Sequence, residues 1–476
     1  MVATITILGA DAQISGDFSL STVIDATSYY QLGFEFTPRY KMGAWDGRIR
    51  LFKRMNSTFP SGLVTDVAEA LRTDGFRVHI DDKRRCPPIS PIPKDIKLHG
   101  VSFEYPYDYQ LDCMQKMVNA QRGVVALATN AGKTECACLV TACLRLPTLF
   151  LVPGKELLYQ TQKRFATRFG IGLDEVGIIG DGIWKPNQWI TVAIIASLYE
   201  ALKAGKPKAT NLLDSTELLF ADECHRVGSE SWYEVIRACN AFFRFGMSGT
   251  PLKRSDGADL KLIAATGPII YEVRNKFLIE RGISSKAEIR LVAIRQPEIP
   301  KKTPYRDVYR IGITENLQRN RALCLIVDQL VKEGHKVVVM VREIEHGNQI
   351  DKRLWSFKTQ SFLTHQFING QEPTNVRQKA LRDFEKGDLQ VLIATSILDE
   401  GIDLPCIDAI VLAGGGKSSI KTLQRIGRGL RKGKSGKLIV VDTIDFQHHY
   451  LLEHSNQRLL DYRGEDCFTI VEHKVV

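Results

Sequence analysis

Apolar and polar positions in the first hundred residues follow two different periods. "ATITILG" (residues 3–9) alternates as a strand does, and "FRVHID" (76–81) alternates more weakly. "STVIDATSYY" (21–30) and "GLVTDVAEALRTDG" (62–75) have helical spacing, and Gly75 is placed to end the second helix. The run "CPPISPIPK" (86–94) is typical of a stiff, extended linker. The pattern predicts a small α+β domain over residues 1–90.

From about residue 103 onward, apolar runs alternate with helical stretches. The runs that indicate strands are residues 123–129, 148–153, 189–195 and 217–222, and then 288–294, 335–341, 391–396, 409–414 and 437–442. Continuous apolar runs of this length are typical of parallel strands that helices cover on both faces. The pattern predicts two successive α/β units, over residues 91–278 and 279–476.

Composition narrows the class of protein only a little. The 476 residues, 44% of them hydrophobic, are enough for two or three domain cores, and the net charge of +10 is compatible with a polyanionic partner. Ten cysteines without a CxxC pair favour reduced thiols in the cytoplasm. The N-terminus lacks the basic and apolar regions of a signal peptide, and no run of about 18 apolar residues predicts a membrane span.

A phosphate-binding turn is predicted where the strand at 123–129 gives way to a helix. The sequence there is "NAGKT", Asn130 to Thr134. A Gly-containing turn at a helix N-terminus directs backbone N–H groups at an anion; Lys133 would reach the phosphates and Thr134 would hold Mg²⁺. The strict pattern has a glycine six places before Lys133, where this chain has Leu127. The alternative is a strand–helix turn with an exposed lysine.

Two acidic residues follow the strand at 217–222. Asp222 would lie at the carboxyl end of a parallel strand, where such sheets bind ligands, and could hold Mg²⁺ with Thr134. Glu223 could orient or deprotonate an attacking water. A zinc site is disfavoured because the cysteine spacing supplies no further ligands. A catalytic Cys224–His225 pair is disfavoured because adjacent residues on an extended chain face opposite sides.

An ordered series of motifs resembles those of the superfamily 2 helicases and translocases. They are "YDYQLDC" (107–113), "ATNAGKT" (128–134), "FLVPGKELLYQT" (150–161), "GIIGDG" (177–182), "TVAIIASL" (191–198), "DECH" (222–225), "MSGTP" (247–251), "VLIATSILDEGIDLP" (391–405) and "LQRIGRGLR" (423–431). The resemblance covers about residues 105–445. It implies two tandem RecA-like parallel-sheet domains that bind ATP and Mg²⁺.

The resemblance also implies roles for single residues. The nucleotide-binding set is Gln110, Thr129, Asn130, Ala131, Gly132, Lys133, Thr134, Gly401, Asp403 and Gln424, with Thr134 and Asp222 on the metal. The catalytic set is Lys133, Glu223 and the arginine fingers Arg428 and Arg431. His225, Ser248 and Thr250 would couple nucleotide state to motion, and Pro153, Gly154 and Thr395 would contact a nucleic-acid strand. Taken alone, the arginine-rich stretch could be a solvated helix end, and His225 an exposed histidine after a strand.

The N-terminal stretch "FTPRYKMGAWDGRIRLF" (36–52) resembles the N-terminal domain of the UvsW family of phage recombination helicases. It interleaves aromatic and basic residues, so Arg39, Lys41, Arg48 and Arg50 are candidate phosphate contacts, and Trp45 could stack on bases or wedge into a junction. In the alternative, Trp45 fills the core of the small domain and the arginines lie on its solvated face.

The predicted function is an ATP-dependent DNA helicase or translocase that acts on branched or double-stranded DNA, with single-stranded DNA a further substrate, in recombination, repair or fork processing. An RNA helicase is one alternative, because the motifs do not distinguish the sugar. An ATP-gated duplex-binding remodeller that does not separate strands is another. The motifs specify neither the unwinding polarity nor the preferred junction nor the oligomeric state, and no membrane partner is expected.

Overall fold

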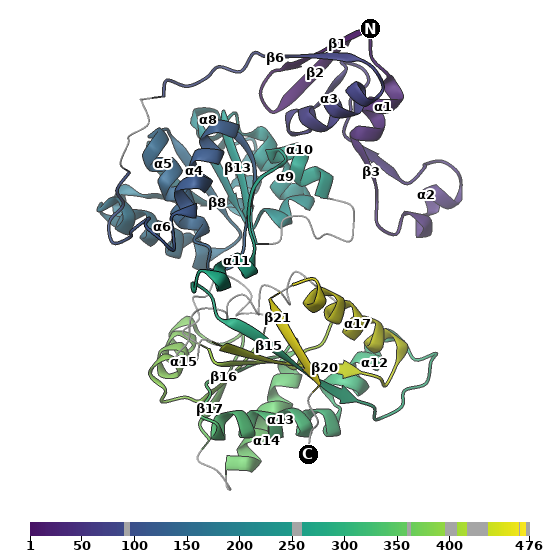
Figure 1. Cartoon of the computed structure of the whole chain (residues 1–476), viewed down its shortest axis with the longest axis vertical. Helices are drawn as coiled ribbons and strands as arrows, with labels where there is room; N and C mark the ends of the chain where they lie inside the picture. Colours follow the sequence, from purple (N-terminus) through teal and green to yellow (C-terminus); the bar gives the residue numbers. More distant parts are fainter. Residues whose placement is uncertain are drawn as a thin grey trace. The chain divides into compact units, whose positions relative to one another are not determined.

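The computed structural model describes residues 1–89, 96–249, 259–358, 363–395, 407–416, 437–465 and 467–472. The chain forms two compact units: Met1–Ala128 with Gly132–Val273, and Thr129–Ala131 with Arg274–Val476. Each unit contains a large parallel sheet between helices, and a small α+β region precedes the first sheet (Figure 1). The predicted fold class is confirmed. The three-part division at residues 90 and 278 stays a prediction, because the N-terminal region belongs to the first compact unit.

A four-stranded sheet forms the body of the N-terminal region. Its strands, in the order β5-β2-β1-β6, are β5 (Thr58–Pro60), β2 (Asp11–Gly16), β1 (Val2–Ile7) and β6 (Arg77–Asp82), and α1 (Leu20–Ala26) and α3 (Val64–Thr73) pack on it. Both predicted strands are present, and Gly75 follows α3 at φ +87°. The helix predicted over residues 21–30 is wrong at its end, because Ser28–Tyr30 form strand β3, paired with β4 (Arg48–Arg50). Pairing with a partner strand outweighs local helical spacing there.

The N-terminal region is packed against the first α/β unit. Its apolar core, which includes Ile5, Leu63 and Val67, continues into Ala264 of helix α10 (Asp259–Thr266). Gly62 lies so close to α10 that a Cβ there would overlap the backbone oxygen of Ile263. The N-terminal region and α10 share an apolar core, and their backbones meet at Gly62. These two features leave the N-terminal region little freedom to move relative to the first α/β unit.

Arginine side chains from the first α/β unit reinforce this contact. Arg237 donates to the Asp11 carboxylate at 2.6 Å, and Arg122 donates to the Ser61 hydroxyl at 2.5 Å. Arg122 is partly buried, and desolvation and the neighbouring Arg244 hold its pKa well below the usual arginine range. Partly desolvated charges are costly unless they are paired, so these contacts favour one docked arrangement of the N-terminal region over others.

The first large sheet has eight strands in the order β10-β9-β11-β8-β12-β13-β7-β14, all parallel except β10. The strands are β7 (Arg122–Leu127), β8 (Thr148–Val152), β9 (Gly177–Gly180), β10 (Ile183–Lys185), β11 (Ile190–Ile194), β12 (Leu218–Asp222), β13 (Phe243–Ser248) and β14 (Ile269–Val273). The helices are α4 (Tyr109–Ala120), α5 (Lys133–Leu144), α6 (Lys155–Phe169), α7 (Ile195–Lys203), α8 (Pro207–Ser215), α9 (Glu230–Ala238) and α10 (Asp259–Thr266).

Both faces of this sheet are buried, which explains its uninterrupted apolar strands. Leu149 and Leu219 point to the side covered by α7 to α10. Phe150 and Phe220, the next residues along the same strands, point to the opposite side, where Phe150 meets Phe165 of α6. Because all the main strands run in parallel, their carboxyl ends gather at one edge, and loops from distant parts of the sequence meet there.

The second sheet has seven parallel strands in the order β17-β18-β16-β19-β20-β15-β21. The strands are β15 (Lys286–Ile294), β16 (Val337–Met340), β17 (His365–Ile368), β18 (Val391–Ala394), β19 (Ala409–Leu412), β20 (Lys437–Asp445) and β21 (Phe468–Glu472). The helices are α11 (Asn275–Glu280), α12 (Tyr305–Tyr309), α13 (Leu317–Lys332), α14 (Ile344–Lys358), α15 (Thr374–Lys386) and α17 (His449–Arg463).

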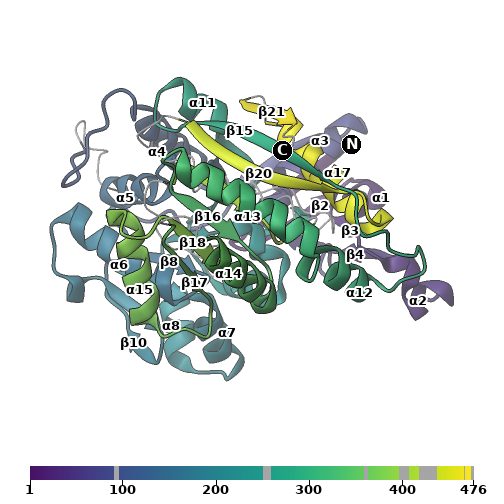
Figure 2. The same cartoon turned by 90° about the horizontal axis from the view of Figure 1, so that it is seen from below.

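Helices α13 and α14 cover one face of the second sheet and lie in front of its strands in Figure 2. Helices α15 and α17 contribute Phe384 and Tyr462 to the core of the other face. Buried Arg319 ties α13 to this sheet by donating to Asp445 of β20 at 3.1 Å. In the described residues, no helix is long and apolar enough to cross a membrane.

The close approach at Gly62 leads to a stability prediction. Gly62→Ala places a methyl group where the α10 backbone stands, so we expect the free energy of unfolding to fall by about 1–3 kcal/mol, as for other overpacked sites. Gly370→Ala is the matched control, because a Cβ there meets no atom within 4 Å. Thermal unfolding of both variants makes the comparison. Equal melting temperatures would contradict the tight docking of the N-terminal region.

Candidate functional site

The turn between β7 and α5 has the conformation of an anion-binding loop. Asn130 has φ +74° and Gly132 has φ +78°, so the backbone turns sharply before Lys133 begins the helix. A Cβ at Gly132 would overlap the side-chain amide of Gln110, so both space and backbone conformation require glycine. Leu127, which replaces the expected first glycine, is fully buried as the last residue of β7. The loop is therefore short, and residues 128–132 alone make the turn.

Lys133 lies beside the acidic pair that follows β12. Its Nζ is 3.5 Å from the Oε1 of Glu223, and both side chains are about one-fifth exposed. The backbone N–H of Glu223 donates to Asp222 Oδ1 at 3.0 Å. Strand pairing explains the meeting, because β13 lies between β7 and β12 and holds their carboxyl ends in register. The structure therefore brings two predicted motifs together across about 90 residues of sequence.

Asp222 is a buried carboxylate. Burial, followed by repulsion from Glu223, raises its pKa to about 6, whereas Lys133 opposes this shift. A carboxylate that is expensive to ionise gains from a nearby cation. This buried acid and the hydroxyl-bearing Thr134 at the start of α5 are thus chemically suited to a divalent cation that nucleotide phosphates also hold.

Glu223 connects the nucleotide loop to the next strand. It has φ +51°, which turns the chain sharply after β12. Its Oε2 is 3.3 Å from His225 Nδ1, and the same nitrogen is 3.1 Å from the Oγ of Ser248, the last residue of β13. Because a carboxylate can only accept, a proton on Nδ1 suits the contact with Glu223. A continuous polar chain runs from Lys133 through Glu223 and His225 to Ser248.

A second acidic residue near the turn is kept away from the anion position. Glu135 lies in the first turn of α5, where its charge would repel a phosphate. Arg164 and Arg168 of α6 both donate to its carboxylate, at 3.0 and 2.7 Å. The two arginines neutralise Glu135, so Lys133 and the loop N–H groups determine the local charge. Sequence reasoning did not single out this triad, although its spacing on α5 and α6 is regular.

The predicted strand-contacting residues of the first unit lie at the carboxyl ends of β8 and β9. Pro153 and Gly154 follow β8, and Lys155 begins α6 and forms an ion pair with Asp181, which follows β9. The Tyr159 hydroxyl donates to Asp181 at 3.0 Å. Lys155 and Tyr159 are both exposed, and sequence analysis missed them as candidates. The signal was available, since both lie within the quoted run 150–161.

The second unit has its own row of residues at the carboxyl edge. Thr395 follows β18 and is buried. Arg342 follows β16 and is exposed, with its guanidinium 5.3 Å from the ring of Tyr309. The Tyr309 hydroxyl donates to the Gly414 oxygen after β19 at 2.6 Å. Sequence analysis did not identify Arg342 or Tyr309. The remaining predicted residues, Thr250, Gly401, Asp403, Gln424, Arg428 and Arg431, lie outside the described residues.

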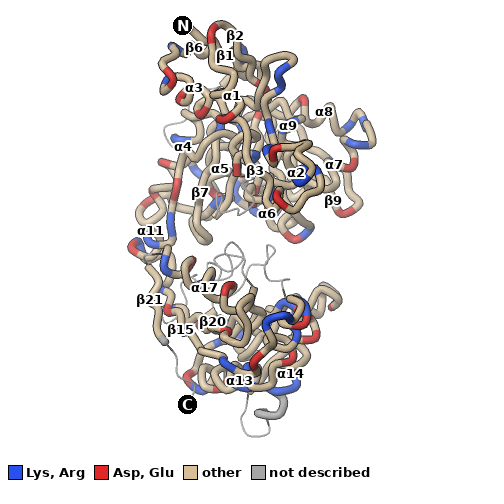
Figure 3. Tube along the Cα trace, turned by 90° about the vertical axis from the view of Figure 1, so that its right-hand side faces the viewer, with Lys and Arg blue, Asp and Glu red and all other residues tan. Residues whose placement is uncertain are grey.

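The N-terminal candidates are not equally accessible. Arg48 forms an ion pair with Asp25, and Arg50 with Asp46. Arg39 and Lys41 are exposed, and within the described part of the chain neither forms an ion pair. Trp45 is half-buried: its indole N–H donates to the Arg48 oxygen at 2.9 Å, and it is outside the apolar core of the region. Basic residues are distributed over both units, without a single basic tail (Figure 3).

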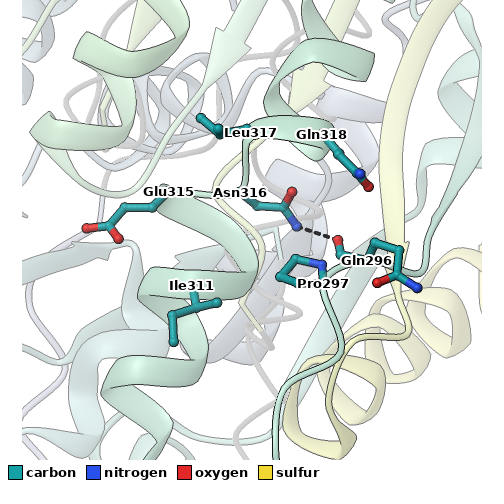
Figure 4. Close-up of a pocket in the computed structure, with 7 residues that line it drawn as sticks. All are labelled: Gln296, Pro297, Ile311, Glu315, Asn316, Leu317 and Gln318. Carbon is teal, nitrogen blue, oxygen red and sulfur yellow. Dashed lines mark hydrogen bonds between the residues drawn. The ribbon is translucent and has the colours of Figure 1, made fainter.

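A hollow in the second unit has a different chemistry. It measures about 320 Å³, and Asn316 donates across it to the Gln296 oxygen at 2.8 Å (Figure 4). Its described lining contains Glu315 and no basic side chain, so it is poorly suited to a phosphate. Among the described residues, no group of three or more His, Cys, Asp or Glu side chains could hold a metal ion. Magnesium bound mainly through phosphates needs no such group.

Comparison with known proteins gives three domain matches. Residues 104–253 match the family described as type III restriction enzyme, res subunit, residues 318–433 match the helicase conserved C-terminal domain, and residues 11–81 match the N-terminal domain of the DNA helicase UvsW. The chain is 26% identical to the ATP-dependent DNA helicase uvsW of Enterobacteria phage T4, and the alignment covers 93% of each protein.

One further relative and one solved structure are similar to the two α/β units. The DNA 3'-5' translocase XPB2 of Sulfurisphaera tokodaii is 23% identical over 70% of this chain and 80% of its own. A fragment of an HsdR subunit of a type I restriction enzyme from Vibrio vulnificus has the same fold, with a TM-score of 0.57 and 20% identity, covering 78% of this chain and 69% of the fragment.

By its domain matches, this chain resembles the superfamily 2 helicases. Its N-terminal region adds a feature that the two α/β units do not provide. The chain resembles UvsW both in its N-terminal region and in the two α/β units that follow it.

The burial of Asp222 leads to a second prediction. A carboxyl whose folded pKa lies above its unfolded value costs stability at every pH above the folded pKa, here about 6. Asp222→Asn keeps the acceptor for the Glu223 N–H and removes the charge. We expect the melting temperature at pH 8 in EDTA to rise by about 2–4 °C for each kcal/mol recovered. Calorimetry with the exposed Asp17→Asn as control tests this; a lower melting temperature for Asp222→Asn would contradict it.

Proposed function

We propose that the protein is an ATP-dependent DNA helicase or translocase that acts on branched or double-stranded DNA in recombination, repair or fork processing. The observation that carries the proposal is the polar chain from Lys133 to Ser248 at the carboxyl edge of the first sheet. It joins a phosphate loop to a candidate base and to the end of a neighbouring strand. Such an arrangement can convert hydrolysis into movement of a loop.

The nucleotide site is assigned to residues of the first unit. Gln110 lies against Gly132, in a position to recognise the adenine beside the phosphate loop. Lys133 leaves Glu223 to pair with phosphate oxygens, and Thr134 and Asp222 hold Mg²⁺, which would neutralise charge on the phosphates. Glu223, once separated from Lys133, orients the attacking water and accepts its proton.

Coupling to movement is assigned to His225 and Ser248. When the Glu223 carboxylate moves, the His225 ring loses or changes its contact with Glu223. The ring then alters its hydrogen bond with Ser248 at the end of β13. The resemblance assigns the arginine fingers Arg428 and Arg431 to the second unit, so full hydrolysis requires residues from both units. Charge stabilisation by such fingers is the usual way in which closure of two domains is linked to phosphoryl transfer.

DNA contacts are assigned to exposed polar groups along the carboxyl edges and to the N-terminal region. Lys155 and Tyr159 in the first unit and Arg342 in the second are exposed and lie next to the predicted strand-contacting residues. Arg39 and Lys41 add cations that no described acidic side chain neutralises. DNA as the substrate is supported by the relatives' names, which describe a DNA helicase and a DNA translocase, and by the UvsW-type N-terminal match. Preference for branched DNA is part of the proposal.

The substrate class can be decided by one set of measurements. Steady-state ATP hydrolysis is compared with four-way DNA, blunt duplex, single-stranded DNA and RNA at equal nucleotide concentration and fixed salt. The proposal expects the largest stimulation with branched or duplex DNA. Stimulation by RNA alone would support an RNA helicase. Duplex-stimulated hydrolysis with neither strand separation nor movement along the duplex would support an ATP-gated remodeller.

The division of labour between Lys133 and Glu223 is also testable. Glu223→Gln should still bind ATP and Mg²⁺ but fail to turn over, because only water activation is lost. Lys133→Ala should abolish hydrolysis without unfolding the protein, because Lys133 is a cleft residue outside the core. Fluorescent-nucleotide titration and steady-state hydrolysis measure the two effects separately. Loss of nucleotide binding in Glu223→Gln would show that the roles of Asp222 and Glu223 are exchanged.

A further inference from the structure

Residues 28–50 of the N-terminal region form a projecting segment, which contains β3, β4 and the short helix α2 (Pro38–Lys41) and extends from the four-stranded sheet (Figure 1). We call it the projecting segment. Three of its large apolar side chains are far more exposed than a domain surface usually allows: Leu32 is 63% exposed, Phe36 78% and Met42 73%. Several large, exposed apolar side chains on one small segment indicate an interaction site.

The projecting segment is held in shape by its own small aromatic cluster. Phe34 lies 5.2 Å from the ring of Tyr30 and 4.8 Å from that of Tyr40, in an edge-to-face contact with Tyr40. Gly47, at φ +82°, leaves room for the Phe34 ring, which any side chain there would overlap. Thr37 closes the turn by donating to the Phe34 oxygen at 2.7 Å. The segment therefore does not need Leu32, Phe36 or Met42 for its own packing.

Phe34 and Phe36 belong to the same three-residue turn and have opposite surroundings. Phe34 faces the cluster, whereas Phe36 points into solvent. A segment that only had to fold could place a polar residue at position 36. The aromatic cluster around Phe34 fixes the backbone of this turn, and the fixed backbone holds the Phe36 ring in solvent.

The charge around these apolar side chains favours a polyanion. Residues 28–54 contain six basic and two acidic side chains. Arg48 and Arg50 are committed to ion pairs, but Arg39, Lys41, Lys53 and Arg54 are exposed and, within the described residues, form none. Cations flanking apolar and aromatic side chains match a partner that presents phosphates beside unstacked bases. Phenylalanine, leucine and methionine are side chains that proteins insert between base steps.

We propose that Leu32, Phe36 and Met42 form a wedge that inserts at a DNA branch point and displaces the terminal base pair while Arg39 and Lys41 hold the flanking phosphates. This rests on the proposed function and adds the place of strand separation. Insertion replaces solvent around three apolar side chains with bases, which offsets part of the unstacking. The wedge acts on binding, before any hydrolysis, because it lies outside the nucleotide site.

The test uses the full chain and a forked duplex with 2-aminopurine in the last base pair before the branch. Binding of the wild type without ATP should increase the 2-aminopurine fluorescence, since the base becomes unstacked. Phe36→Ala/Met42→Ala should reduce that increase about tenfold or more, the size expected for lost base stacking. Fluorescence is compared at fork concentrations that saturate each protein, so that a change in affinity does not enter the comparison. ATP hydrolysis with single-stranded DNA should stay close to wild type, because the nucleotide site is unchanged.

Two controls separate the wedge from general effects. Leu8→Ala removes another exposed apolar side chain (Leu8 is 56% exposed) from the turn between β1 and β2, and should leave the fluorescence increase unchanged. Phe36→Leu/Met42→Leu keeps apolar bulk and should restore most of the increase. Recovery by leucine would show that apolar volume at the branch, and not a specific ring, is required.

Each contrary result has its own meaning. A fluorescence increase in Phe36→Ala/Met42→Ala equal to the wild type overturns the wedge. So does a wild type that binds the fork and hydrolyses ATP while the 2-aminopurine stays stacked, and the proposed function survives that result. Concentration-dependent self-association that the double alanine variant abolishes would assign the surface to contact between copies. A wild type that neither binds the fork nor hydrolyses ATP with any DNA overturns the proposed function together with the wedge.

Discussion

The ion pair between Lys133 and Glu223 is the contact on which the chemistry of the first unit depends. It exists because β13 lies between β7 and β12 and holds the ends of those strands side by side. The apolar strands thus position a cation and a carboxylate that are far apart in sequence. Each neutralises the other in this contact. Under the proposed function, a nucleotide that pairs with Lys133 would also release Glu223, so that one displacement would supply both a phosphate ligand and a base.

Much of the fold and part of the site could be predicted from the sequence. Strands buried on both faces read as continuous apolar runs, and these marked β7, β8, β11 and β12 of the first large sheet and β15, β16, β18, β19 and β20 of the second. They did not mark β13, because arginine and glycine interrupt its apolar residues. The helix predicted over residues 21–30 failed where Tyr29 and Tyr30 pair with β4. Lys133 and Glu223 were identifiable because their motifs carry fixed spacing. Lys155 and Arg342 were missed because an exposed cation at a strand end has no period to mark it.

The N-terminal region shows a further limit of sequence reasoning. Alternating aromatic and basic residues suggested phosphate contacts for four cations, but the sequence does not say which of them the protein itself neutralises. Asp25 and Asp46 take Arg48 and Arg50 and leave Arg39 and Lys41. Likewise, the proline-rich run suggested a domain boundary, whereas contacts from Arg122 of β7 and Arg237 of α9 attach the N-terminal region to the first α/β unit. Whether a basic side chain is available to DNA depends on whether an acidic side chain of the protein already pairs with it, and only the fold determines those ion pairs.

Rigid docking changes what the projecting segment can do. A wedge on a flexible tether would move with the DNA and separate nothing, because the force on the bases would be lost in the tether. Here the segment extends from a region that shares a core with α10, and Gly62 allows backbone to meet backbone at that contact. Movement of the first unit along DNA would carry Leu32, Phe36 and Met42 with it. The exposed apolar side chains would separate the bases, and the shared core together with the contacts of Arg122 and Arg237 would hold those side chains in place on the first unit.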